Sequence, residues 1–341
     1  MQLLCVGDIA IEEGGLQPWP PPLETPADGV WRTLLNWELP AGGALNPIPR
    51  SSGPRLLAHP DAPAVLARWA PGFACLATNH ILDAGAEGLA RTQAALRQAG
   101  FETLGAGRTA EEAARPLRWE TAEGALALLN WVFPETHPDS GATPGPNVWP
   151  GFEAAAEALA QARRGADWVF AVVHWSDECF GYPRPEDRAA ARRLLALGAD
   201  AVIGHHPHVV RGVETIAGRP VFYSLGNLYF TSMTEPRARE GLGVRFSLRR
   251  GERPAYDLLS FWQSPGRAER DARRRAERRL RRVSRVLAQT DGGAYAAWYA
   301  IRRRRYDRWG HRWHFGVRRL GWAGTLRVLW RKAWGAARGI R

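Results

Sequence analysis

The sequence predicts an α/β fold in which a mixed sheet is layered with helices. Segments of strand and helix character alternate over the first two thirds of the chain, and consecutive strand-like segments follow. Several polar residues come directly after predicted strands, where open α/β sheets bind ligands. The chain has 341 residues, 45% of them hydrophobic and 23% charged, which is enough to bury a core, and 36 Gly with 25 Pro exclude a coiled coil.

The first half of the chain contributes strands, long loops and one clear helix. Residues 85–100 predict that helix, because Leu89, Thr92 and Leu96 share one face and Gly100 is a stop signal. Apolar segments predict strands at 2–10, 73–79 and 125–133. Residues 30–39 predict a short strand or a helix end that feeds a strand. The segments rich in Pro and Gly predict long loops at 14–29, 40–63 and 134–151.

The second half continues the alternation and then becomes all strand. Helices are expected at 152–164 and 186–197. A hairpin turn is expected at Ala217-Gly218, between two apolar segments. Strands are expected at 168–175, 200–206, 242–248 and 256–262.

Charge divides the chain unevenly. Residues 266–341 hold 23 of the 46 basic and 5 of the 34 acidic residues, a net charge of +18, which leaves −6 for the remainder. We therefore expect one domain over residues 1–264 and an Arg- and Trp-rich helical tail over 265–341. Because the excess positive charge belongs to the tail, it does not indicate a nucleic-acid-binding fold.

The tail carries an amphipathic pattern over residues 266–289. Its apolar positions are spaced by three and four residues, as on one helix face: Ala268, Ala272, Ala276, Leu280, Val283 and Leu287. Residues 294–341 then interleave Arg with Trp. Three interpretations stay open: a packed helical extension, attachment to an anionic membrane surface, or binding of a polyanion. Among polyanions we expect an anionic polymer or a phosphorylated substrate, and nucleic acid is disfavoured.

The start of the chain and its cysteines bear on location. Met1 to Ala10 lack a basic segment and a cleavage site, so they predict a first strand and not a signal peptide. No apolar run reaches the roughly 18 residues of a membrane span. Cys5 and Cys75 lie in apolar runs and are expected to be buried thiols. We expect a cytoplasmic protein, with peripheral association at the inner membrane face as a further option.

Polar residues at strand ends form the candidate site. Together they offer two carboxylates, amides and several imidazoles, a donor set suited to one or two divalent metal ions. His206 and His208 flank Pro207, and we expect an extended backbone there that points both imidazoles the same way. The full set is Asp8, Asn36, Glu38, Asn79, His80, His174, His205, His206, His208 and Asn227.

Five motifs in order resemble a known family. They are ATNHILDAGAEGL, LGAG, HWSDE, GADAVIGHHPHVV and VFYSLGN, within residues 3–232. They are similar to the bacterial CapA family of capsule (poly-gamma-glutamate) synthesis, which is itself similar to calcineurin-like metallophosphoesterases. The resemblance implies a four-layer α/β/β/α sandwich with a metal site at the strand ends.

The resemblance also implies roles for individual residues. The metal ligands would be Asp8, Glu38, Asn79, His174, His206 and His208, with Mn, Fe, Zn or Mg as the ion. His80 would stabilise charge or protonate the leaving group, and Asp83 would orient it. From its position four residues after His174, Glu178 would support a metal ligand or meet a substrate ammonium, or it is a solvated loop carboxylate; we count it among the catalytic candidates. We place Asn36, His205 and Asn227 as substrate-binding residues. Cys179 lacks a basic partner in the sequence and is not expected to be a nucleophile.

Two departures from the metallophosphoesterase pattern affect the site. The first motif there is Asp-x-His, but position 10 is Ala10, so one metal loses a ligand. The bridging aspartate is replaced by the longer Glu38. We expect a metal-dependent hydrolase of phosphoester or amide bonds in capsule or poly-gamma-glutamate synthesis or processing. The alternative is a non-catalytic accessory protein that binds polymer or membrane.

Overall fold

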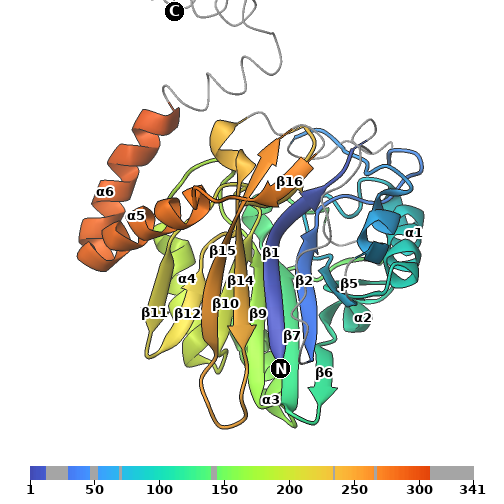
Figure 1. Cartoon of the computed structure of the whole chain (residues 1–341), viewed down its shortest axis with the longest axis horizontal. Helices are drawn as coiled ribbons and strands as arrows, with labels where there is room; N and C mark the ends of the chain where they lie inside the picture. Colours follow the sequence, from blue (N-terminus) through green and yellow to red (C-terminus); the bar gives the residue numbers. More distant parts are fainter. Residues whose placement is uncertain are drawn as a thin grey trace, which may run out of the picture.

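Two β-sheets lie face to face in the computed structural model of the chain, with helices on their outer faces (Figure 1). The structure describes residues 1–12, 30–46, 53–68, 71–139, 144–232, 235–264 and 267–307. The predicted loop at 14–29 lies outside these residues. Among the described residues, no helix combines the length and apolar character needed to cross a bilayer.

The first sheet has eight strands and is mixed. Its central strands β1, β2, β3 and β4 run parallel, and β14, β15 and β16 extend it antiparallel beyond β1. β13 pairs with the end of β1 in parallel, with Asp8 opposite Asn227. The strands are β1 (Gln2–Ala10), β2 (Trp31–Trp37), β3 (Gly72–Cys75), β4 (Phe101–Leu104), β13 (Asn227–Phe230), β14 (Glu240–Ser247), β15 (Ala255–Ser264) and β16 (Arg267–Arg270).

The second sheet has six strands in the order β11-β12-β10-β9-β7-β6. The inner four strands are parallel and the two edge strands antiparallel. The strands are β6 (Leu117–Thr121), β7 (Gly124–Val132), β9 (Trp168–His174), β10 (Ala201–His205), β11 (Val213–Ile216) and β12 (Arg219–Phe222). A separate short ladder pairs β5 (Ala106–Gly107) with β8 (Gly145–Pro146).

Three apolar cores separate the four layers. Successive residues of β9 alternate between cores, because side chains of a strand point to opposite faces: Phe170 enters the core between the sheets, and Val169 the core on the outer face. That outer core is covered by α3 (Phe152–Arg163) and α4 (Pro185–Ala196). The outer face of the first sheet is covered by α1 (Gly85–Gln98) and the 3₁₀ helix η1 (Ala62–Arg68). The predicted α/β/β/α sandwich is confirmed.

Most predicted elements are present, with shifted ends. The helix expected at 85–100 is α1, which buries the predicted Leu89, Thr92 and Leu96. The predicted hairpin turn joins β11 to β12, with φ of 50° at Ala217 and 78° at Gly218, as such turns require. The sequence analysis did not separate β4, β6, β13 or the short helix α2 (Ala110–Ala114).

The chain after residue 264 packs on the sandwich as far as it is described. The helix predicted over 266–289 begins later than expected, which is a correction: Arg267–Arg270 forms β16, paired with β15, and α5 spans Arg275–Gln289. Within α5 the apolar stripe does face inward, since Leu280 joins the core between the sheets and Val283 the outer core beside α4. Ala272 precedes the helix and is exposed.

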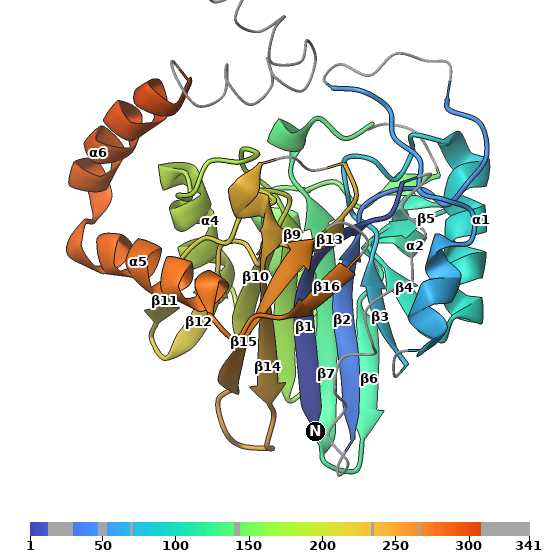
Figure 2. The same cartoon turned by 45° about the horizontal axis from the view of Figure 1, so that its top comes forward.

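A last helix follows α5 on the same side of the molecule. In Figure 2, α5 and α6 (Gly292–Arg305) lie on the side that carries β11 and α4, in agreement with the contacts of α5 with β11 and of α6 with α4. The tail tryptophans beyond Trp298 lie outside the described residues. A domain boundary between residues 264 and 265 stays a prediction.

Leu280→Ala tests whether α5 is part of the fold. Removing a fully buried side chain lowers the free energy of unfolding by about 2–5 kcal/mol, whereas the exposed control Arg282→Ala changes it by less than about 0.5 kcal/mol. Leu280 is 2% exposed. Chemical denaturation of both variants measures the difference. Equal stabilities would show that α5 does not contribute to the core.

Candidate metal centre

The two sheets bring their polar strand ends together. Asp8 lies in β1 and Asn36 in β2 of the first sheet, and His174 and His205 end the neighbouring strands β9 and β10 of the second. The members from the first sheet, from the second sheet and from the turns between are all buried, half of them with no exposed surface: Asp8, Asn36, Glu38, Asn79, His80, His174, His205, His206, His208 and Asn227.

Two glycines let β1 and β13 approach closely at this point. A Cβ on Gly7 would lie 2.1 Å from the carbonyl oxygen of Gly226, so a side chain there would force the strands apart. Gly226 itself has a φ of +68°, which favours glycine. The Asp8 amide donates to the Gly226 carbonyl at 2.9 Å. The glycines that precede Asp8 and Asn227 in the sequence thus place these two residues side by side.

The Asp8 carboxylate collects donors from both sheets. Its Oδ1 accepts from Asn36 Nδ2 at 3.1 Å and from His205 Nδ1 at 2.8 Å. Its Oδ2 accepts from the His206 amide at 3.2 Å and lies 3.2 Å from His208 Nδ1. Burial alone would raise the pKa of Asp8, but the hydrogen bonds from His205 and His208 outweigh it and hold that pKa well below its usual range. Asp8 is therefore a buried anion.

Glu38 is the second buried carboxyl group of the cluster. Asn36 Nδ2 donates to its Oε2 at 2.7 Å, and its Oε1 lies 3.4 Å from His174 Nε2. Burial raises the pKa of Glu38 to about 8. Burial opposes charge on His208 too, yet the hydrogen bond to Asp8 and the charge of Glu38 raise its pKa to about 9. The cluster therefore concentrates acidic groups whose ionised forms need a nearby cation.

Two groups of side chains could each hold a divalent ion. Ligand atoms of Glu38, His174 and His206 lie within 4.8 Å of one another, and so do those of Glu178, His206 and His208. Burial lowers the pKa of His174 and of His206 well below the usual range, which keeps both imidazoles neutral and able to bind metal.

An unsatisfied ring nitrogen of His206 indicates that these residues fit a metal ion. Its Nδ1 is buried and has no hydrogen-bond partner in the part of the chain that the structure describes. Leaving such an atom unsatisfied costs about 1–3 kcal/mol, and a bound ion is one way to remove that cost. Since His206 belongs to both groups, the donor set fits a metal centred near this imidazole.

The predicted ligand Asn79 and the predicted acid His80 lie beside this cluster. Asn79 Oδ1 lies 3.0 Å from His174 Nε2. His80 Nδ1 lies 2.6 Å from Asp83 Oδ2, and Asp83 also accepts from the Leu56 amide at 2.7 Å. The Asp83 carboxylate therefore fixes one ring nitrogen of His80, as the sequence analysis expected. Metal binding by the six predicted ligands stays a prediction.

The backbone at His206-Pro207-His208 corrects one expectation. The segment is not extended, because φ is +92° at His206 and +57° at His208, conformations that side chains with a Cβ rarely adopt. The two rings still come close, with centroids 5.6 Å apart. Two hydrogen bonds hold the strained turn. The His206 amide donates to the Asp8 carboxylate, and the Pro207 carbonyl accepts from the Cys179 amide at 2.8 Å.

The other predicted residues have definite places. Asn36 lies between Asp8 and Glu38, and Asn227 Oδ1 lies 3.0 Å from His208 Nδ1. With His205 on Asp8, these three contact candidate ligands, and substrate binding by them stays a prediction. Cys179 is buried, as are Cys5 and Cys75.

Ala10 lies in the apolar core, so position 10 offers no ligand. Glu178, which the sequence analysis assigned to catalysis, lies in a candidate ligand group.

The sequence analysis missed one residue that supports the site. Arg211 is fully buried next to the loop that carries Glu178, and its guanidinium donates three hydrogen bonds to oxygen atoms of that loop. A lone arginine after a strand gives no signal in the sequence.

This α/β/β/α sandwich with a buried cluster of imidazoles and carboxyl groups matches a known family. A model described as "Bacterial capsule synthesis protein PGA_cap" matches residues 3–232, about two thirds of the chain. The chain belongs to this family.

Individual relatives agree with the family. The PGA biosynthesis protein CapA of Bacillus subtilis (strain 168) is 29% identical over 184 residues, covering 53% of this chain and 48% of that protein. A protein of Mycobacterium tuberculosis (strain H37Rv) named as a probable polyglutamine synthesis accessory protein is 34% identical over 184 residues, covering 50% and 48%. The chain spans about half the length of the curated relatives it matches. A hypothetical protein of Thermus thermophilus superposes with a TM-score of 0.41 and 15% identity, covering 77% of this chain and 100% of that chain.

His206→Ala tests the metal centre. Because His206 belongs to both candidate ligand groups, the variant is expected to lose the divalent metal that the wild-type protein retains after supplementation and desalting. Mass spectrometry of metals on the purified proteins measures this. His59→Ala is the matched control, since the His59 ring contacts its neighbour Asp61 and belongs to neither candidate ligand group. Equal metal content in all three proteins would contradict a centre at His206.

Proposed function

We propose that the chain is a metal-dependent hydrolase acting in the synthesis or processing of capsule polymer. The observation that carries this is the group Glu38, His174 and His206, buried together and with one imidazole nitrogen unsatisfied in the described structure. Membership of the capsule synthesis family gives the process. The names of the relatives point to poly-gamma-glutamate or a related polymer.

The donor set fits one or two divalent ions. Glu38, His174 and His206 would hold one, and Glu178 with His208 would complete the second group around the same imidazole. A divalent ion bound there supplies Lewis acidity toward a phosphoryl or carbonyl oxygen and toward water. Asp8 would keep His205 and His208 in place through its two hydrogen-bonded oxygens. Glu178 would supply a carboxylate ligand to the second group, while position 10 supplies none.

His80 is the proton donor of this proposal. The Asp83 carboxylate accepts a hydrogen bond from Nδ1 of His80. The other ring nitrogen, Nε2, is therefore the atom that exchanges a proton with the leaving group. The carboxylate of Asp83 is itself fixed by the Leu56 amide and by Arg55, whose Nη1 lies 3.4 Å from Asp83 Oδ1. Asp83 therefore acts as a positioning residue for the His80 ring.

Asp83→Asn and His80→Gln test this arrangement. Both are expected to lower kcat, by about 10²–10⁴-fold for His80→Gln, while metal content stays at the wild-type level because neither residue is in a candidate ligand group. The assay is hydrolysis of a phosphodiester, bis(p-nitrophenyl) phosphate, and of poly-gamma-glutamate, each with Mn²⁺. His59→Ala again serves as the control.

The outcomes separate the two classes of function. A drop in kcat at constant metal content supports the hydrolase, and the substrate that is cut identifies the bond. Wild-type protein that retains metal but turns over neither substrate would favour the alternative, a non-catalytic accessory protein. The loss of a ligand position at Ala10 is the observation that supports this alternative.

Exposed arginines support an anionic partner for either class. Arg278, Arg282 and Arg285 lie on the outer side of α5 and are exposed. Such a row would attract a polyanion or an anionic membrane surface. Since α5 also fills the core, deletion of the tail would disturb the fold, and substitutions of exposed residues give the cleaner test.

The triple variant Arg278→Gln, Arg282→Gln, Arg285→Gln is expected to bind poly-gamma-glutamate more weakly than wild type at low salt. The difference should disappear at high ionic strength, because salt screens exposed charges. Binding is measured by fluorescence anisotropy of a labelled polymer, and sedimentation with anionic vesicles tests the membrane in parallel. A triple variant that binds both as wild type does would contradict a role for this row.

A further inference from the structure

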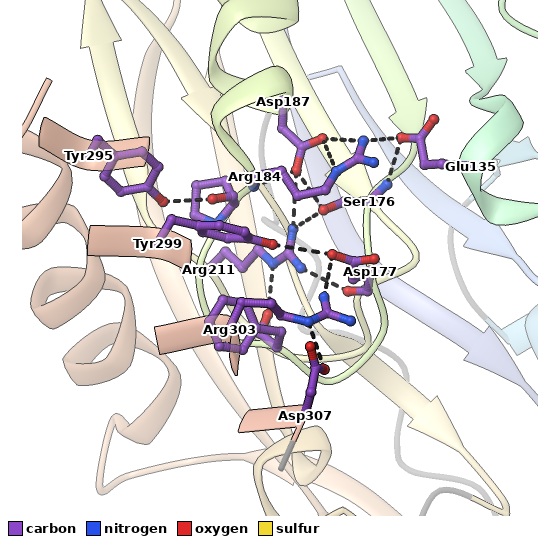
Figure 3. A network of polar contacts seen from close by, with 12 residues as sticks. Glu135, Ser176, Asp177, Arg184, Asp187, Arg211, Tyr295, Tyr299, Arg303 and Asp307 are labelled. Atoms are coloured by element: carbon purple, nitrogen blue, oxygen red, sulfur yellow. Dashed lines mark hydrogen bonds and ion pairs between the residues drawn. The ribbon is translucent and has the colours of Figure 1, made fainter. Parts of the chain in front are cut away.

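A C-terminal helix outside the family-matched region contacts the loop that carries Glu178. Residues 176–180, hereafter the 176–180 loop, connect the end of β9 to the segment before α4. Helix α6 begins at Gly292, sixty residues beyond the end of the match at 232. Figure 3 shows Tyr299 and Arg303 of α6 pointing toward Asp177 of this loop.

The 176–180 loop is strained and therefore needs support. φ is +76° at Ser176 and +59° at Cys179, and neither residue is glycine. Such conformations are strained for a residue with a Cβ and persist only where the surroundings enforce them. The position of Glu178, which lies between these two residues, depends on whatever holds the loop.

Arg211 supports the loop from the interior of the protein. Its guanidinium is fully buried and donates to three of the loop's oxygens: to Ser176 Oγ at 2.5 Å, to the Asp177 carbonyl at 2.8 Å and to the Phe180 carbonyl at 3.0 Å. Asp187 of α4 accepts from Ser176 Oγ at 2.5 Å. Figure 3 shows this network continuing to Arg184 and Glu135. These contacts fix the backbone on both sides of Glu178.

Helix α6 holds the loop from outside. Tyr299 Oη donates to Asp177 Oδ2 at 3.2 Å, and Arg303 forms an ion pair with the same carboxylate. The ring of Phe180 packs edge-on against Tyr299, with centroids 5.3 Å apart, and the Arg303 guanidinium lies over it at 5.6 Å. Asp177 is the residue next to Glu178, so α6 acts within one residue of the candidate ligand.

We propose that α6 positions the Glu178 carboxylate beside His206 and His208, with Arg303 and Tyr299 as positioning residues that act through Asp177. This inference rests on the proposed function, because it takes Glu178 as a ligand. It extends the site beyond the family-matched region to a helix that leads into the basic, Trp-rich end of the chain.

The ion pair between Arg303 and Asp177 is expected to affect metal affinity more than protein stability. The side chains of Arg303 and Asp177 are 26% and 34% exposed, so water screens their ion pair and it contributes little to stability. Partners that orient a metal ligand, in contrast, change metal affinity by about 10–100-fold. Arg303→Gln is therefore expected to bind metal about 10-fold more weakly while its Tm stays close to that of wild type.

The experiment is a Co²⁺ titration of metal-free protein, followed by visible absorption. The variants are Arg303→Gln, Glu178→Gln, the double variant, and Arg304→Gln as the control, which removes an exposed neighbouring arginine of α6. We expect Arg304→Gln to match wild type and the double variant to bind no more weakly than Glu178→Gln alone. Tyr299→Phe, which removes one hydroxyl, should weaken binding less than Arg303→Gln.

Two results would overturn the inference. One is equal Co²⁺ affinity in Arg303→Gln and Arg304→Gln. The other is a full additive loss in the double variant, which would show that Arg303 acts apart from Glu178. Wild-type protein that binds no Co²⁺ would instead overturn the proposed function, and the ligand role of Glu178 with it. A metal-free readout is amide hydrogen exchange at Cys179, expected to be faster in Arg303→Gln than in Arg304→Gln.

Discussion

The buried carboxylate of Asp8 is the constraint on which the site depends. It belongs to β1 in the first sheet, yet its hydrogen-bond partners His205 and the His206 amide belong to the end of β10 in the second. An ionised carboxylate with no exposed surface must satisfy its oxygens with donors, and these donors bring the two sheets together at their polar ends. The same bonds fix the strained turn at His206, and through it the spacing of the candidate ligands.

A site built in this way is favourable only when its charges balance. Asp8 and Glu38 place two acidic groups in a volume that excludes water, with His208 as the imidazole whose pKa is raised. The neutral imidazoles of His174 and His206 add donor atoms but no positive charge. A divalent cation meets both requirements, because it neutralises carboxylates and accepts imidazole nitrogen lone pairs.

Much of the fold and the candidate site could be predicted from sequence because both are written locally. The strands are apolar runs, and most site residues lie at the end of a strand or within a few positions after it. Parallel pairing therefore collects them at one edge of the sheets. The turn at His206 could not be predicted, since its left-handed backbone is imposed by Asp8 and Cys179 from distant parts of the chain. Arg267–Arg270 has helix-like spacing but becomes a strand because the free edge of β15 pairs with it.

The role of α6 was beyond sequence reasoning for the same cause. Tyr299 and Arg303 resemble the other aromatic and basic residues of the tail, and only tertiary packing places them on Asp177. Arg211, likewise, becomes informative only when its burial against the 176–180 loop is known.

We propose that a divalent ion binds where Glu38, His174 and His206 converge. Anomalous X-ray diffraction from a crystal grown with Mn²⁺ would locate it. We expect an anomalous peak within coordination distance of Glu38 and of both imidazoles. A crystal with Mn²⁺ bound elsewhere, or with hydrogen-bonded water at this position under saturating Mn²⁺, would contradict it.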